Sequence, residues 1–142
     1  MELMIVVIIL GIIAGYGTVS YQQAQLKARE RDIRVQLNAL HGAIQMYYAR
    51  NNQYWDTDAM TPKIRGVDDI YATFGINLTE QDGLEYIYRG YAGGASYIAW
   101  GKDHTNNFHV RITEVSMNSG LIPCCERDSG NGPCPTLPDC TF

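Results

Sequence analysis

The sequence predicts an α+β protein in which one long N-terminal helix packs on a small antiparallel sheet of three or four strands. Apolar residues recur at helical spacing up to about residue 51, and no proline interrupts the chain before Pro62. Alternating apolar and polar residues, separated by glycine and polar turns, then occupy residues 84–115. Four cysteines lie near the end of the chain, where we expect disulfides to clamp a loop region.

The 142 residues suffice for one small domain in addition to an apolar helix. We expect a hydrophobic transmembrane or filament-core helix at residues 1–25 and a globular head at residues 26–142. The head divides into the second half of the helix, a connector, the sheet and a cysteine-bounded tail, at residues 26–52, 53–83, 84–115 and 116–142.

The apolar first segment carries one charge, at Glu2, and is uncharged from Leu3 to Tyr21. That length approaches the ~20 residues that a membrane-spanning helix needs. A cleavable signal peptide is not expected, because the basic flank and the small-residue cleavage site are missing. A carboxylate in an apolar environment is costly without a partner, and the segment contains no Lys or Arg. We therefore expect the partner of Glu2 to come from another copy of the chain, which indicates assembly rather than catalysis.

Three glycines lie in the second half of this apolar segment: Gly11, Gly15 and Gly17. Gly11 and Gly15 have the G-x-x-x-G spacing that allows helices to pack closely in membranes. Glycine also weakens a helix by about 1 kcal/mol relative to alanine. Both effects are relevant if the segment leaves lipid and packs among copies of itself.

The second half of the predicted helix is amphipathic. One stripe of apolar residues, which we expect to pack on the sheet, consists of Leu26, Ile33, Leu37, Leu40, Ile44 and Tyr47. A basic cluster interleaved with acids is interpreted as a solvated, salt-bridged helix face; it consists of Lys27, Arg29, Arg31 and Arg34 with Glu30 and Asp32. The helix is predicted to run from Glu2 to a stop at about Asn51, a length of roughly 75 Å.

The connector mixes Asp, Thr, Gly and Pro, with one short turn of helix expected near Gly66–Thr73. Asn77-Leu78-Thr79 matches the glycosylation sequon, so Asn77 is a candidate glycosylation site, although such triplets are common by chance.

An antiparallel meander is predicted after the connector. Its strands cover residues 84–89, 95–100 and 108–113, with a short fourth strand near Ser119–Pro123. Gly93-Gly94 and the polar residues 102–107 supply the two turns.

The tail contains Cys124, Cys125, Cys134 and Cys140, an even number in a Pro/Gly-rich segment. This pattern predicts disulfides made in an oxidising compartment. Three connectivities exist, and we favour pairing Cys124 and Cys125 each with Cys134 or Cys140, since a vicinal bond needs a strained ring. A zinc site is the weaker alternative, because the paired C-x2-C spacing of structural zinc sites is missing.

No catalytic residue, metal site or cofactor is predicted. The three histidines are scattered, and no nucleotide-binding, hydrolase or metalloprotease motif occurs in the sequence. Asp/Asn/Gly turns at residues 103–107 and 128–132 offer oxygen ligands for calcium, but such residues usually form only turns. The net charge of -4 argues against nucleic acid as a main partner.

The residues E-L-M-I-V-V (Glu2 to Val7), followed by Gly11 and Tyr21-Gln22, resemble the class III signal region of type IV pilins and of the pseudopilins of type II secretion. The usual start in that family is F-T-L-I-E-L-M-I-V-V. Because Phe-Thr-Leu is absent before the matching residues, we expect the mature chain to begin about three residues before Met1.

The resemblance implies the type IV pilin fold, with a long helix, a variable connector, a small sheet and a cysteine-bounded tail. It also implies leader removal by a prepilin peptidase and methylation of the new terminal amine. The role carried to Glu2 is neutralisation of the amine of a neighbouring subunit. Many members have proline where this chain has Val19, so any melting of the helix in the filament would rely on Gly11, Gly15 and Gly17.

The expected function is that of the major structural subunit of a type IV pilus, a helical filament of identical subunits on the cell surface. Before assembly, the resemblance implies an inner-membrane anchor and contact with the pilus assembly machinery. Motility, adhesion, DNA uptake and secretion all fit such a filament. The alternatives are a minor pilin, a type II secretion pseudopilin, or a membrane-tethered periplasmic binding module that never polymerises.

Overall fold

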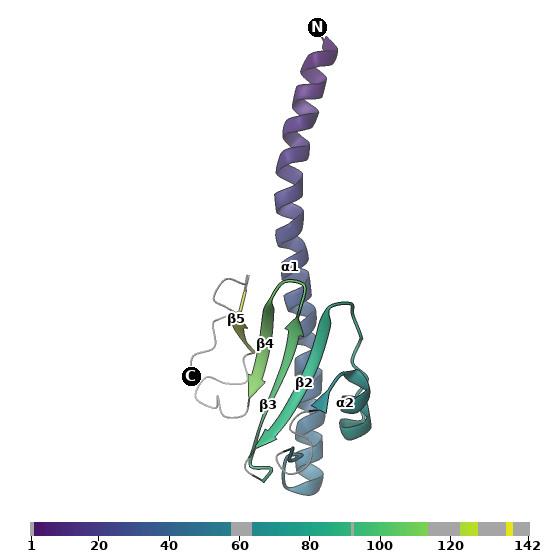
Figure 1. Cartoon of the computed structure of the whole chain (residues 1–142), viewed down its shortest axis with the longest axis vertical. Helices are drawn as coiled ribbons and strands as arrows, with labels where there is room; N and C mark the ends of the chain where they lie inside the picture. Colours follow the sequence, from purple (N-terminus) through teal and green to yellow (C-terminus); the bar gives the residue numbers. More distant parts are fainter. Residues whose placement is uncertain (1, 58–63, 92, 114–122, 128–135, 138–142) are drawn as a thin grey trace.

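The computed structural model describes residues 2–57, 64–91, 93–113, 123–127 and 136–137. Within these residues the predicted α+β class is confirmed, because one long helix lies on one face of an antiparallel sheet (Figure 1). The elements in chain order are α1 (Glu2–Asn51), β1 (Ile64–Arg65), α2 (Val67–Phe74), β2 (Leu84–Tyr91), β3 (Ser96–Asp103), β4 (Phe108–Thr113) and β5 (Cys124–Arg127).

The long helix has the extent that the sequence predicts. α1 is one helix of 50 residues, and only its second half lies against the sheet, so its first half extends away from the head (Figure 1). It ends where Asn52 adopts a left-handed φ of 56° and donates its N–H to the carbonyl of Tyr48 at 2.7 Å. The side-chain amide of Asn51 donates to the carbonyl of Tyr47 at 3.0 Å. These two asparagines satisfy carbonyls of the last turn and stop the helix.

The sheet is the predicted meander. Among the described residues it contains five strands in the order β1-β2-β3-β4-β5, and every neighbouring pair is antiparallel. The central strands β2, β3 and β4 match the three predicted strands to within three residues at each end. Short connections at Gly93-Gly94 and at residues 104–107 join them, as a meander requires.

Both edges of the sheet differ from the prediction. The two-residue β1 was not predicted; Ile64 lies opposite Tyr88 and Arg65 opposite Ile87. The fourth strand was expected near Ser119–Pro123, but β5 begins at Cys124, and residues 114–122 lie outside the described part of the chain. Edge strands this short carry too little sequence pattern to be recognised locally, because pairing with β2 or β4 defines them.

Between β1 and β2, the helical turn expected near Gly66–Thr73 is confirmed as α2, with Gly66 as its N-cap. Its C-cap, Gly75, has a φ of 70° and donates its N–H to the carbonyl of Tyr71 at 2.8 Å.

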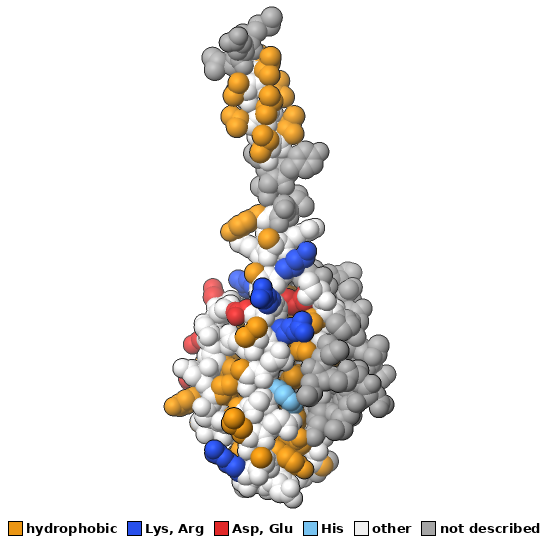
Figure 2. All heavy atoms as spheres, turned by 180° about the vertical axis from the view of Figure 1, so that it is seen from behind, with side chains coloured by type: hydrophobic (Ala, Val, Ile, Leu, Met, Phe, Trp, Pro, Cys, Tyr) orange, Lys and Arg blue, Asp and Glu red, His pale blue; other side chains and the backbone are white. Residues whose placement is uncertain are grey.

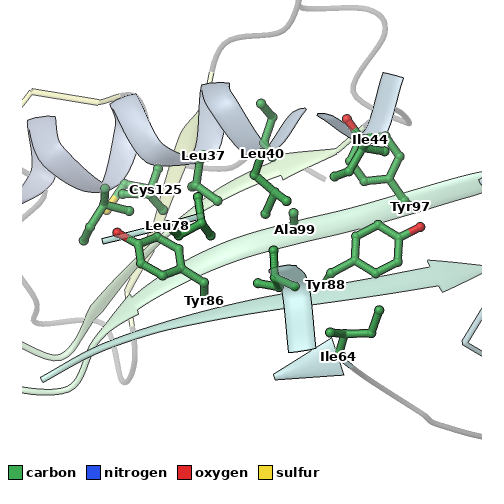
Figure 3. Close-up of a cluster of buried hydrophobic side chains, with 14 of the residues drawn as sticks. Leu37, Leu40, Ile44, Ile64, Leu78, Tyr86, Tyr88, Tyr97, Ala99 and Cys125 are labelled. Carbon is green, nitrogen blue, oxygen red and sulfur yellow. The ribbon is translucent and has the colours of Figure 1, made fainter. Parts of the chain in front are cut away.

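The core lies between α1 and the sheet. The stripe residues Ile33, Leu37, Leu40 and Ile44 are fully buried, which confirms the predicted seam, while Leu26 and Tyr47 at its ends are half-buried. Figure 3 shows α1 side chains pointing toward the aromatic and aliphatic residues of the strands. The strand residues in this core are Tyr86 and Tyr88 of β2, Tyr97 and Ala99 of β3, Phe108, Val110 and Ile112 of β4, and Cys125 of β5.

Candidate assembly surface

The first part of α1 exposes apolar side chains around its whole circumference. The large apolar residues from Met4 to Ile13 are between 50% and 76% exposed. Figure 2 shows them as a column of hydrophobic side chains that stands clear of the head. A helix that is apolar all round is normally buried in a larger assembly or in lipid. No helix within the described residues is both long and apolar enough to cross a membrane.

This column, residues 4–13, is the candidate assembly surface. Contiguous exposed apolar surface of this kind marks an interaction site, because apolar area contributes about 25 cal/mol per Å² once it is removed from water. Nothing in the described head covers it: the elements that pack most extensively on α1 are β3, β4 and α2, and all three lie beside its second half.

Gly11 lies within the column, and no described atom would come within 4 Å of a Cβ placed on it. A side chain at position 11 would therefore meet no obstacle within the subunit. The fold itself does not require glycine there, so any requirement for close approach comes from outside the described chain. Glu2, Gly15 and Gly17 belong to α1 as predicted, but their side-chain surroundings lie outside the description, and the partner of Glu2 remains a prediction.

The basic cluster is only in part the solvated, salt-bridged helix face that we predicted, since Lys27, Arg31 and Arg34 are exposed but Glu30 is not. Glu30 is only 1% exposed, and both its carboxylate oxygens accept hydrogen bonds from Thr136, whose N–H donates to Oε2 at 3.1 Å. The sequence holds a signal that could have revealed this, since the stripe has a gap of seven residues between Leu26 and Ile33. Position 30 fills that gap at helical spacing and so faces the head.

Arg29 also contacts the head, although its side chain is still 36% exposed. Its Nη1 lies 3.5 Å from Oδ2 of Asp103, a carboxylate that is fully buried at the end of β3. The N–H groups of Thr105 and Asn106 donate to Oδ1 of Asp103 at 2.9 and 3.1 Å, and the Asn106 amide donates to Oδ2 at 2.7 Å. The turn that offered calcium ligands in the sequence thus uses its carboxylate to close the β3–β4 connection and to hold α1.

A second polar contact joins α1 to the connector. The Thr79 N–H donates to Oε1 of the buried Gln36 at 2.8 Å, and Nε2 of Gln36 donates to the Thr79 carbonyl at 3.4 Å. Leu78 is buried, whereas Asn77 is exposed, so the candidate sequon presents its asparagine to solvent. Glycosylation of Asn77 stays a prediction.

The tail cysteines are described only in part. Cys125 is buried in the core and Cys124 is half-buried, and neither is a free thiol. Cys134 and Cys140 lie outside the described residues, so the predicted pairing with them is not assigned. Among the described residues, no group of three or more His, Cys, Asp or Glu side chains could hold a metal ion.

Comparison of the chain with models of protein families finds no match, and comparisons with curated proteins and with solved structures find none either.

Proposed function

We propose that the chain is the repeating subunit of a type IV pilus, an extracellular filament whose core is a bundle of N-terminal helices. The observation that carries the proposal is the exposed apolar column at residues 4–13, on a helix whose second half packs its own apolar stripe on the head. Helices from neighbouring copies would bury this column, while the heads form the outer layer of the filament.

The sequence supports the same proposal independently. Glu2 to Val7 with Gly11 and Tyr21-Gln22 resembles the signal region of type IV pilins. In an apolar bundle, Glu2 would pair with the terminal amine of a neighbouring subunit and set the register, since a subunit one step out of place leaves both charges unpaired. Within the tail, we propose disulfides from Cys124 and Cys125 to Cys134 and Cys140, which would hold a loop region that buries little apolar surface.

The proposal includes a membrane stage. The uncharged segment from Leu3 to Tyr21 would anchor the subunit in the inner membrane until the assembly machinery extracts it. Leader removal by a prepilin peptidase and methylation of the new amine belong to this stage by resemblance.

Substitution of Glu2 tests the assembly role. We expect Glu2→Ala and the uncharged, similarly sized Glu2→Gln to leave the subunit in the membrane fraction. Both should reduce sheared surface fibres at least about tenfold, because the terminal amine of the neighbouring subunit would be a buried charge without its partner. Fibre yield is measured by quantitative immunoblotting and electron microscopy. Wild-type amounts of fibre from the Glu2→Gln strain would refute the charge-pairing role.

Two glycines of the same helix provide a matched test of packing. Gly11→Ala and Gly42→Ala both add a methyl group in open space, so neither clashes within the subunit. We expect only Gly11→Ala to reduce fibre formation, because only Gly11 lies in the proposed helix bundle. Equal loss in both variants would instead assign the effect to a stiffer helix.

The alternatives predict different fibres. A minor pilin or a pseudopilin would be present in few copies per fibre, whereas a major subunit accounts for most of the fibre mass. A membrane-tethered module that never polymerises would tolerate Glu2→Gln. Helical reconstruction of purified fibres, with density traced to this chain, separates these cases.

A further inference from the structure

α1 changes from apolar to basic where it meets the head. Three cations in this region, Lys27, Arg31 and Arg34, have exposed side chains, and we call them the basic collar. No ion pair involving them is present among the described residues, in contrast to Arg29, which contacts Asp103. Figure 2 shows Lys and Arg side chains gathered where the apolar column meets the head.

A hollow lies beside the collar. It has a volume of about 620 Å³ and is lined by residues of α1 together with Gln81 from the connector. Lys27 and Arg31 bring positive charge to it, and Val35 is an apolar residue that is 58% exposed. Asp32, the one carboxylate among the described residues that line the hollow, accepts a hydrogen bond from the Gln81 amide. The hollow therefore combines two cations that form no ion pair among the described residues with exposed apolar side-chain surface, which suits an anionic group attached to an apolar body.

The order of side chains along α1 matches the layers of a lipid surface. Exposed aliphatic residues 4–13 come first, then Tyr21, which is 65% exposed, and then the collar. A bilayer presents hydrocarbon, the interface that tyrosine prefers, and phosphate in the same order. At 1.5 Å per residue, Lys27 and Arg31 lie roughly 9 and 15 Å beyond Tyr21 along the helix.

The direction of helical side chains shortens that distance. Every Cα–Cβ bond in a helix tilts toward the N-terminus, so the long side chains of Lys27 and Arg31 point back toward the apolar column. Their aliphatic stems can lie along apolar surface while the charged ends reach the phosphate layer.

We propose that the basic collar binds the phosphates of anionic lipids and holds the head against the membrane before assembly. This inference rests on the membrane stage of the proposed function. The whole chain has a net charge of -4, so an anionic surface repels most of the head and attracts the collar. The collar would thus fix which end of the head faces the lipid. Its position next to apolar residues of the same helix favours lipid over an acidic protein surface, which would not need that order.

Lipid selectivity of the full chain in bilayers tests the proposal. The chain is reconstituted into phosphatidylcholine bilayers that carry spin-labelled phosphatidylglycerol or spin-labelled phosphatidylcholine at trace level, and the protein-bound fraction of each is measured by electron paramagnetic resonance. We expect phosphatidylglycerol to be preferred about three- to fivefold, since each cation near the surface contributes to binding. The preference should disappear in 1 M salt, where charges are screened within about 3 Å.

The variant that removes the collar is Lys27→Gln/Arg31→Gln/Arg34→Gln. All three residues are exposed, so near-ultraviolet circular dichroism should show an intact head. We expect equal binding of both lipids by this variant. The matched control is Arg50→Gln, which removes an exposed cation from the last turn of α1 and should keep the wild-type preference.

The outcomes separate the two proposals. A wild-type chain that inserts but shows no preference, or a triple variant that keeps it, overturns the collar proposal and leaves the filament proposal intact. A chain that does not insert at all overturns the membrane stage and the collar with it. A triple variant with unchanged lipid preference but no fibres would assign the collar to contacts between copies, again overturning the proposal.

Discussion

Thr136, near the end of the chain, donates both its N–H and its hydroxyl to the carboxylate of Glu30 in the middle of α1. The two residues are 106 positions apart, and Glu30 is only 1% exposed. The next residue, Leu137, is buried in the core. The two hydrogen bonds to Glu30 and the burial of Leu137 in the core fix this point of the tail against the rest of the head.

Removal of the Glu30 carboxylate should destabilise the head. Glu30→Ala leaves the two Thr136 donors without their partner and opens space in a buried site, so we expect a loss of about 2–3 kcal/mol in the free energy of unfolding. The measurement is urea unfolding of the full chain in mild detergent, followed by near-ultraviolet circular dichroism. The control is Glu80→Ala, which removes an exposed acid and should change the free energy by less than about 0.5 kcal/mol. Equal values for the two variants would contradict the tail contact.

Two neighbouring tyrosines of β2 should respond oppositely to loss of their hydroxyl groups. Tyr88 donates to the carbonyl of Trp55 at 2.8 Å, whereas the buried hydroxyl of Tyr86 has no hydrogen-bond partner in the described part of the chain. We expect Tyr88→Phe to lower the free energy of unfolding by about 1 kcal/mol. Tyr86→Phe should leave it unchanged or raise it, because it removes an unsatisfied polar group. A larger loss in Tyr86→Phe than in Tyr88→Phe would contradict this assignment.

Alkaline pH should weaken the fold through the same two residues. Burial is the main cause that raises the pKa of both Tyr86 and Tyr88 well above the ordinary value of 10, with nearby Asp32 adding for Tyr86 and Tyr97 for Tyr88. The folded chain therefore keeps these protons when the unfolded chain has lost them. The stabilisation is complete below pH 10 and falls as pH rises above it, by up to about 1.4 kcal/mol per pH unit for each tyrosine.

The check is urea unfolding of the wild type and of Tyr86→Phe/Tyr88→Phe between pH 8 and 11.5. The double variant should lose stability less steeply above pH 10. Parallel curves would show that other groups dominate the alkaline response.

Two glycines should respond oppositely to alanine. A Cβ on Gly101 of β3 would lie 2.6 Å from Cγ2 of Ile33, so α1 packs on the sheet at a distance that only glycine permits. We expect Gly101→Ala to destabilise the head by about 1–3 kcal/mol through overpacking. Gly42 is helical, exposed and open, and Gly42→Ala should stabilise it by about 0.5–1 kcal/mol. Thermal unfolding of both variants measures the contrast, and destabilisation by Gly42→Ala would contradict it.

Local sequence signals were sufficient for the long helix and the meander. An uninterrupted helical pattern with Asn51-Asn52 at its end predicted α1, and alternation around Gly93-Gly94 predicted β2 and β3. These signals work because helix periodicity, strand alternation and turn chemistry act over a few neighbouring residues. The candidate assembly surface was predicted in the same way, from a run of apolar residues without charges.

The exceptions depend on distant partners. Ile87 alternates with the core-facing residues of β2 and yet is only 4% exposed, on the sheet face away from α1, where Trp100 lies opposite it. Arg29 and Glu30 belong to a charged run that predicts a solvated face. In the structure, however, Arg29 contacts Asp103 and Glu30 accepts a hydrogen bond from Thr136. The charged run alone does not show which charges are buried. For Glu30 the spacing of the apolar stripe gives a signal, whereas the contact of Arg29 depends on Asp103, which is 74 positions away in the chain.

The sequence by itself determined the α+β class, the limits of α1, the buried stripe and the apolar first segment, since each follows from contacts between residues close in the chain or from their spacing. Only the tertiary structure decided which polar groups are buried, where the edge strands β1 and β5 pair, and which cations of α1 form no ion pair with the rest of the described chain. A buried charge or a two-residue strand is stable only with its partner, and that partner lies tens of residues away in the chain.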